Sequence, residues 1–115
     1  MSSSRFRKVA LALPGAVEGA HQGTADFRVG KRIFATIGYP DDDWGMVKLT
    51  PEQQSVLVGA EPEIFRPVPG GWGKYGNTNV RLAKADATTL KRALTMAWQN
   101  LAPKSKAAPR GKKKA

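Results

Sequence analysis

The fold is decided by residues 25–53, which read ADFRVGKRIFATIGYPDDDWGMVKLTPEQ. Apolar and polar residues alternate on both sides of Gly30-Lys31, a pair that suits a two-residue hairpin turn because glycine takes a positive φ at no steric cost. A second turn is expected at Tyr39–Asp43, where Pro and three Asp residues interrupt the alternation. We therefore expect three strands, at about 25–29, 32–38 and 45–49.

The hairpin turn also predicts which side chains share a face of the sheet. If residue 29 pairs with residue 32 and the register continues without interruption, Phe27 pairs with Phe34 and lies on the same face as Val29. The opposite face then carries Arg28, Ile33, Ala35 and Ile37.

The end of this stretch is typical of a helix start. Thr50 is a good cap, Pro51 suits the first helical position, and Gln53 completes a capping box. The resulting helix is short, because Pro62 ends it. Two further strands are expected at about 63–67 and 79–82, around a glycine-rich loop.

The two ends of the chain have helical periodicity. Phe6, Val9, Ala10 and Leu13 are spaced as one face of a first helix, which Pro14-Gly15 ends. A last helix is expected to start at Asp86. Its apolar stripe consists of Leu90, Ala93, Leu94, Ala97, Trp98 and Leu101.

These elements predict an α+β fold with a mostly antiparallel sheet of about five strands. The first and last helices cover one face of the sheet, and the short middle helix lies between strands. The other face is expected to be open. It carries Arg28, Ile33, Met46, Lys48, Arg66 and Arg81.

Charge divides the chain into a body, residues 1–102, and a tail, residues 103–115. Lys and Arg number 19 against 9 Asp and Glu, a net charge of +10. Six of the positive charges lie in the tail, which contains no acid and is rich in Lys, Ala and Pro. Such a segment buries too little apolar surface to fold, so we expect it to be disordered. Its basicity favours contact with a polyanion, with a merely solvated end as the alternative.

Several classes of function are disfavoured. The chain has no Cys and one His, which excludes thiolate sites and a two-histidine metal site within one chain. His21 lies near Glu18 but has no nucleophile or second metal ligand beside it, and the acids at Asp41–Asp43 lack the spacing of a calcium loop. We therefore expect no enzyme, metal or other cofactor.

Location is predicted from the same composition. The apolar run Val9–Leu13 is too short for an export signal, and no stretch approaches the ~18 residues of a membrane span. We expect a cytoplasmic protein that does not contact a membrane, with a monomer as the default state.

The loop Gly71–Gly76 reads GWGKYG and matches the pattern of a dinucleotide fingerprint, but Pro67 and Pro69 precede it and no long helix follows. Core packing is the ordinary role for Trp72. The alternative is that Trp72 and Tyr75, beside Lys74, stack on nucleic-acid bases.

The remaining candidate residues are basic. Arg28, Lys31 and Arg32 cluster at the first hairpin tip, where they suit phosphate contacts or an ordinary solvated surface. The residues predicted to bind nucleic acid are Arg28, Lys31, Arg32, Lys48, Lys74, Arg81, Lys112, Lys113 and Lys114.

Several stretches together resemble the MmcQ/YjbR family of small bacterial proteins. The resemblance covers about residues 5–103. It is carried by Leu11–Glu18, Phe27–Ala35, Val47–Gln53, Gly71–Gly73, Asn79–Leu82 and Ala97–Asn100.

This resemblance implies a fold similar to frataxin and to the double-wing DNA-binding domain of a phage transcription factor, and it implies DNA binding. It supplies no catalytic residues. Frataxin-like iron handling is disfavoured, because the first helix carries Arg5, Arg7 and Lys8 and no acid.

The sequence therefore predicts a non-enzymatic nucleic-acid-binding module, for DNA in the first instance, with low sequence specificity. The alternative is a protein-interaction or small-ligand-binding module in which the basic tail is incidental.

Overall fold

A computed structural model describes residues 3–21, 23–38, 41 and 43–102. The strands form one antiparallel sheet in the order β1-β2-β3-β4-β6-β5. The strands are β1 (Val17–His21), β2 (Thr24–Val29), β3 (Arg32–Ile37), β4 (Trp44–Lys48), β5 (Phe65–Pro67) and β6 (Asn77–Arg81). The helices are α1 (Ser3–Leu11), α2 (Pro51–Ala60), α3 (Gly71–Lys74) and α4 (Ala87–Leu101).

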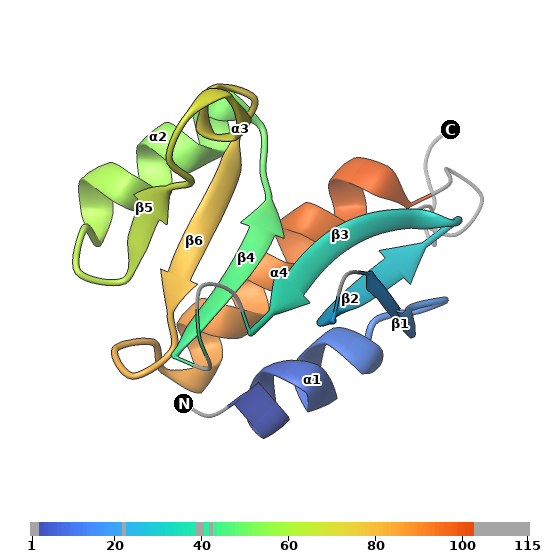
Figure 1. The fold of residues 1–115 in the computed structure, drawn as a ribbon. Helices are drawn as coiled ribbons and strands as arrows, with labels where there is room; N and C mark the ends of the chain where they lie inside the picture. Colours follow the sequence, from blue (N-terminus) through green and yellow to red (C-terminus); the bar gives the residue numbers. More distant parts are fainter. Residues whose placement is uncertain (1–2, 22, 39–40, 42, 103–115) are drawn as a thin grey trace, which may run out of the picture.

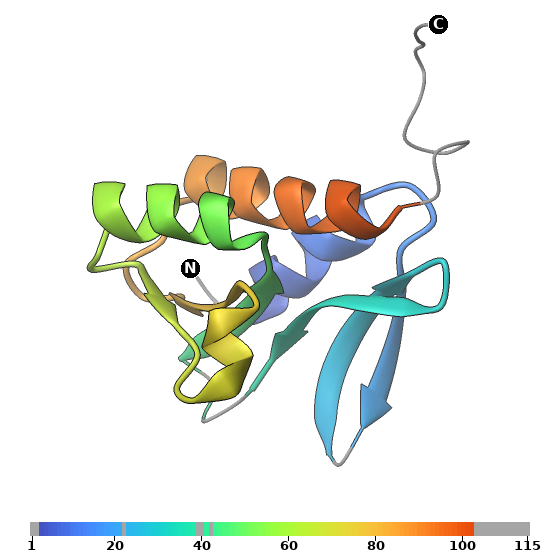
Figure 2. The same ribbon diagram turned by 90° about the horizontal axis from the view of Figure 1, so that it is seen from above.

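The molecule has two layers, which confirms the predicted α+β class. Helices α1, α2 and α4 lie together on one side of the sheet (Figure 2), and α4 packs on β3, β4 and α1. The order of the elements along the chain can be followed in Figure 1. The opposite face of the sheet is not covered by these three helices.

The helix starts form as the sequence predicts. The Thr50 hydroxyl accepts a hydrogen bond from the Gln53 backbone N–H at 3.1 Å, and the Gln53 side chain accepts one from the Thr50 N–H at 2.9 Å. In α4, the Asp86 carboxylate accepts a hydrogen bond from the Thr89 N–H at 2.7 Å. Both caps satisfy backbone donors that a helix leaves unpaired at its first turn.

The core lies between the helical layer and the sheet. The predicted stripe of α4 is buried from Leu90 to Trp98, and α1 contributes Phe6 and Ala10. The Phe6 ring packs so closely on Gly45 of β4 that an added Cβ there would lie 2.5 Å from a ring carbon. Glycine at this position lets α1 approach the sheet.

The predicted register of the first hairpin is correct at the turn and wrong beyond it. Val29 pairs with Arg32 and Arg28 with Ile33, but Phe27 then pairs with Ala35, because the register shifts at a bulge. The bulge makes Phe34 an additional residue. Ala35 and Ile37 therefore lie on the face of Phe27, not on that of Arg28.

The sheet has one strand more than the five expected. Strand β1 contains Gly19 and Ala20, which are weak strand formers, and its Val17 is exposed. The strand forms because it pairs with β2 over its whole length, and its own composition does not predict a strand. The short helix α3 was likewise not predicted, and β6 begins at Asn77 rather than Asn79.

Candidate nucleic-acid interface

Strand pairing places basic residues of three adjacent strands on the open face. Gly45, Val47 and Val80 point toward the helices and are buried. The alternate residues of β4, β6 and β5 therefore point the other way. They include Met46, Lys48, Arg66 and Arg81, which agrees with the face predicted from the sequence.

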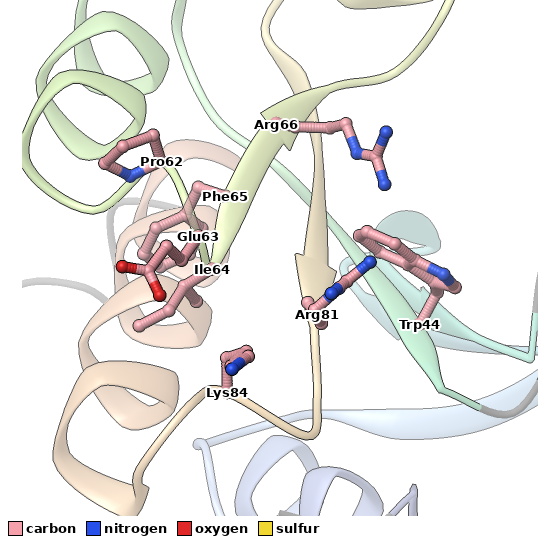
Figure 3. A pocket seen from close by; sticks show the side chains of 8 residues that line it. All are labelled: Trp44, Pro62, Glu63, Ile64, Phe65, Arg66, Arg81 and Lys84. Atoms are coloured by element: carbon pink, nitrogen blue, oxygen red, sulfur yellow. The ribbon is translucent and has the colours of Figure 1, made fainter.

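Trp44 lies at one end of this face and contacts two guanidinium groups. It pairs across β4 and β6 with Arg81. The Cζ atom of Arg66 lies 4.6 Å from the centroid of the Trp44 ring, and that of Arg81 lies 5.2 Å from it (Figure 3). Both distances suit cation–π contacts, which hold the two arginine side chains in place at about 0.5–1 kcal/mol each in an exposed setting.

A hollow of about 470 Å³ opens beside this cluster. Its lining contains three cations, Arg66, Arg81 and Lys84, and one acid, Glu63 (Figure 3). The other lining residues are Trp44, Pro62, Ile64 and Phe65.

Helix α3 and the residue that follows it present two aromatic side chains, Trp72 and Tyr75, at the other end of the face, where Lys48 pairs with Asn77. Trp72 is 68 % exposed and Tyr75 is 78 % exposed, so the sequence expectation that Trp72 packs in the core is wrong. The reason is that Gly73, not Trp72, faces inward: an added Cβ on Gly73 would lie 2.1 Å from the Val68 carbonyl oxygen. Lys74 is exposed beside the two aromatic residues.

Side chains of the body hold this aromatic segment in place. The Asn77 side-chain amide donates to the Trp72 carbonyl at 2.9 Å. The Gln54 side-chain amide of α2 donates to the Gly73 and Asn77 carbonyls at 3.1 and 3.0 Å. The exposed rings thus extend from a fixed backbone, which favours a preformed contact surface.

The tip of the first hairpin is a separate basic site. Gly30 has a φ of 59° and Lys31 a φ of 70°, the pattern of a type I′ turn. Lys31 and Arg32 are exposed. In both ribbon views the turn lies well away from α3 (Figure 1, Figure 2).

Arg28 already has a partner within the protein. Its Nε and Nη2 atoms donate to the two carboxylate oxygens of Asp26 at 2.7 and 3.0 Å. Asp26 is fully buried, and its hydrogen bond and charge raise the pKa of Arg28. We therefore assign Arg28 first to the stability of β2 and only second to ligand contact.

The sequence did not single out three residues of the Trp44 hollow: Trp44, Arg66 as a binding residue, and Lys84. Strand alternation was the signal for the first two, because it places Trp44 of β4 and Arg66 of β5 at outward-facing positions of the sheet. Lys112, Lys113 and Lys114, with the rest of segment 103–115, lie outside the described residues.

The described residues contain neither a candidate metal site nor a candidate membrane-spanning helix. No group of three or more His, Cys, Asp and Glu side chains is arranged to hold a metal ion in that part of the chain. No helix formed by the described residues has the length and apolar character needed to cross a bilayer.

This chain is similar to a solved structure and to one family model. A chain in the crystal structure of protein DR2400 of Deinococcus radiodurans, a DUF419 domain, matches with a TM-score of 0.73 at 23 % identity, over 87 % of this chain and 78 % of that one. The curated proteins give no match. The family model named YjbR matches residues 11–100. That match covers most of the sheet and helices, and the chain therefore belongs to the YjbR family.

Proposed function

We propose that this protein is a non-enzymatic nucleic-acid-binding module of low sequence specificity that contacts phosphates through the open face of its sheet. The observation that carries the proposal is the placement of Lys48, Arg66 and Arg81, from three adjacent strands, on one uncovered face. Basic residues arranged in this way neutralise successive phosphates, and the release of condensed counterions then drives binding.

The two exposed aromatic residues at α3 and its C-terminal end suit the same ligand. Trp72 and Tyr75 are exposed beside Lys74, at the end of the face where Lys48 lies. Exposed aromatic rings beside cations stack on bases of a single strand with little dependence on sequence. Backbone contacts position a nucleic acid but do not select a base sequence, which is why low specificity is proposed.

Two further basic segments, the first hairpin tip and the tail, also support the proposal. Lys31 and Arg32 extend from the hairpin tip, and the tail adds six positive charges without an acid. DNA is the first polyanion to test, in keeping with the family resemblance. We also propose that the protein is cytoplasmic, in keeping with its lack of Cys. It acts as a monomer without a cofactor in this proposal.

Binding to duplex and single-stranded DNA across a salt series tests this function. Lys48→Gln and Arg81→Gln should each lower affinity and reduce the slope of log affinity against log salt by about 0.7–0.9. Lys91→Gln is the matched control, because Lys91 is exposed on α4 in the helical layer. An equal loss in the control would show that net charge, not the open face, carries binding.

A small-ligand or protein-interaction role is the second candidate function. The hollow beside Trp44 favours it, since its volume of about 470 Å³ lies in the range of ligand pockets. Full-length protein with no affinity for DNA or RNA even at low salt would exclude the first function and leave this one.

A further inference from the structure

The Trp44 hollow gathers positive charge from separate segments of the chain. Arg66 comes from β5, Arg81 from β6, and Lys84 from the turn after β6. Within the described residues none of the three forms an ion pair, and Glu63 is the one acid of the lining. Like charges held together in this way repel one another, and a bound anion would relieve that repulsion.

The contact with Trp44 positions the arginines for a particular kind of anion. A guanidinium is always charged and carries five N–H donors around the edge of its plane. Contact with the indole ring holds both guanidinium groups beside the hollow, and neither forms an ion pair with another described residue. Two such edges suit an anion with several oxygens around one centre, which accepts paired hydrogen bonds.

The charge in the hollow favours a phosphate monoester over an internal phosphodiester. A monoester carries about −1.5 to −2 charge near neutral pH and presents three oxygens, whereas a diester carries one negative charge. Three cations against one carboxylate leave a net excess of two positive charges in the lining, counted as three minus one. The monoester therefore matches the hollow in both charge and number of acceptors.

The remaining walls suit the organic group that carries the phosphate. Pro62 and Ile64 form an apolar side of the hollow, and Glu63 offers a carboxylate that accepts hydrogen bonds from hydroxyl or amino groups. Sugar hydroxyls and exocyclic base amines are donors of this kind. The lining therefore offers apolar contacts and a hydrogen-bond acceptor that inorganic phosphate cannot use.

We propose that the Trp44 hollow binds the terminal phosphate monoester of a nucleotide, with Arg66, Arg81 and Lys84 holding the phosphate. The inference rests on the proposed nucleic-acid function when the nucleotide is the end of a strand. It also holds by itself if the ligand is a free mononucleotide, because both sources present the same group.

The test compares two single strands of identical sequence, one with and one without a 5′ phosphate, using the full-length protein. Fluorescence anisotropy should show about tenfold tighter binding of the phosphorylated strand, the effect of one additional charge-assisted contact. Adenosine monophosphate should compete with that strand more strongly than adenosine does. Inorganic phosphate should compete weakly, because it leaves the apolar wall unused.

Variants locate the effect. Arg66→Gln and Arg81→Gln should abolish the preference for the phosphorylated strand, whereas Lys91→Gln should leave the ratio unchanged. Lys84 is exposed and outside the strands, so Lys84→Gln provides a variant with little risk to folding. A ratio unchanged in folded Lys84→Gln and Arg66→Gln proteins would overturn the assignment of the hollow.

The outcomes separate this inference from the function on which it rests. Equal binding of both strands, with no competition by the monophosphate, overturns the inference and leaves the nucleic-acid function standing. Failure of both strands together with Arg66-dependent binding of the monophosphate supports the hollow and removes the nucleic-acid function. Failure of all three probes overturns both.

Discussion

At the scale of single residues, Trp98 joins the last helix to the segment that follows the first. Its side chain is 6 % exposed within the core stripe of α4. The indole N–H donates to the Pro14 carbonyl at 2.7 Å, across 84 positions of sequence. The residue therefore fills core volume and also satisfies a loop carbonyl.

Trp98→Ala should be among the most damaging single changes. Truncation of a buried Trp lowers the free energy of unfolding by about 3–5 kcal/mol, through lost burial and the cavity left behind. Trp98→Phe is the control, since it keeps most of the packing and loses the hydrogen bond, and it should cost less. Denaturant titration measures both, and a loss under about 1 kcal/mol for the Ala variant would contradict the buried role.

Asp86 makes the stability of α4 depend on acid pH. The hydrogen bond from the Thr89 backbone N–H is the main cause that lowers the pKa of Asp86 from its ordinary value of 3.8. A lowered pKa means that the unfolded chain binds the proton more readily. This contribution is therefore fully present above pH 3.8 and is lost as the pH falls through the lower folded value.

Asp86→Asn isolates that contribution, because Asn also caps helices but does not titrate. The melting temperature of the native protein should exceed that of the variant at neutral pH, and the difference should shrink as the pH falls below 3.8. Thermal unfolding between pH 6 and about 2.5 provides the measurement. A difference that is constant with pH would show that the carboxylate charge contributes nothing at this cap.

At the scale of elements, glycines set how α3 and its flanking loop meet the body. Gly76 has a φ of 101°, and an added Cβ there would lie 2.0 Å from the Leu49 carbonyl oxygen. The backbone N–H of Leu49 in turn donates to the Gly76 carbonyl at 3.2 Å. This close approach fixes the start of β6 against the end of β4, and with it the position of Trp72 and Tyr75.

Gly76→Ala should destabilise the protein by about 2 kcal/mol or more, because it combines a disfavoured φ with a backbone clash. Gly59→Ala is the matched control with the opposite sign. Gly59 lies in α2, and an added Cβ would meet nothing within 4 Å. The helix should gain up to about 0.5–1 kcal/mol. Equal effects of the two changes in denaturant titration would contradict this account of Gly76.

At the scale of the whole molecule, positive charge is distributed over two parts. Residues 1–102 carry 13 Lys and Arg against 9 acids, a net of +4, and residues 103–115 carry the other six positive charges. The hydrophobic core is formed by residues between Phe6 and Trp98. We therefore expect the body to fold without the tail, so that the two parts can be tested separately.

Deletion of residues 104–115 should leave the melting temperature nearly unchanged and weaken DNA binding. If all six tail charges neutralise phosphates, the tail alone contributes about −5 to the slope of log affinity against log salt. We expect the truncated protein to retain a slope of about −2 to −4 from the body. Filter binding across a salt series measures both slopes. Truncated protein without measurable affinity at low salt would eliminate the role of the open face.

Local features of the fold could be predicted from the order of residues alone. Three of these features depend on residues within four positions of one another: the capping box at Thr50–Gln53, the Asp86 cap and the turn at 30–31. A short stretch of sequence is therefore enough to predict each of them. The apolar stripe of α4 is also a local pattern, since helical spacing repeats every 3.6 residues. The α+β class and the family resemblance followed from these pieces.

Contacts between residues far apart in the chain could not be predicted in this way, because they depend on how the elements pack. One bulge at Phe34 placed Ala35 and Ile37 on the core face, and no local pattern announces such an insertion. The contact of Arg66 and Arg81 with Trp44 depends on the pairing of β4 and β5 with β6, across 22 and 37 positions of sequence counted from the residue numbers. Trp72 is exposed because Gly73 takes the inward position in α3. Long-range pairing and close packing select these neighbours, and neither is encoded within a few residues of chain.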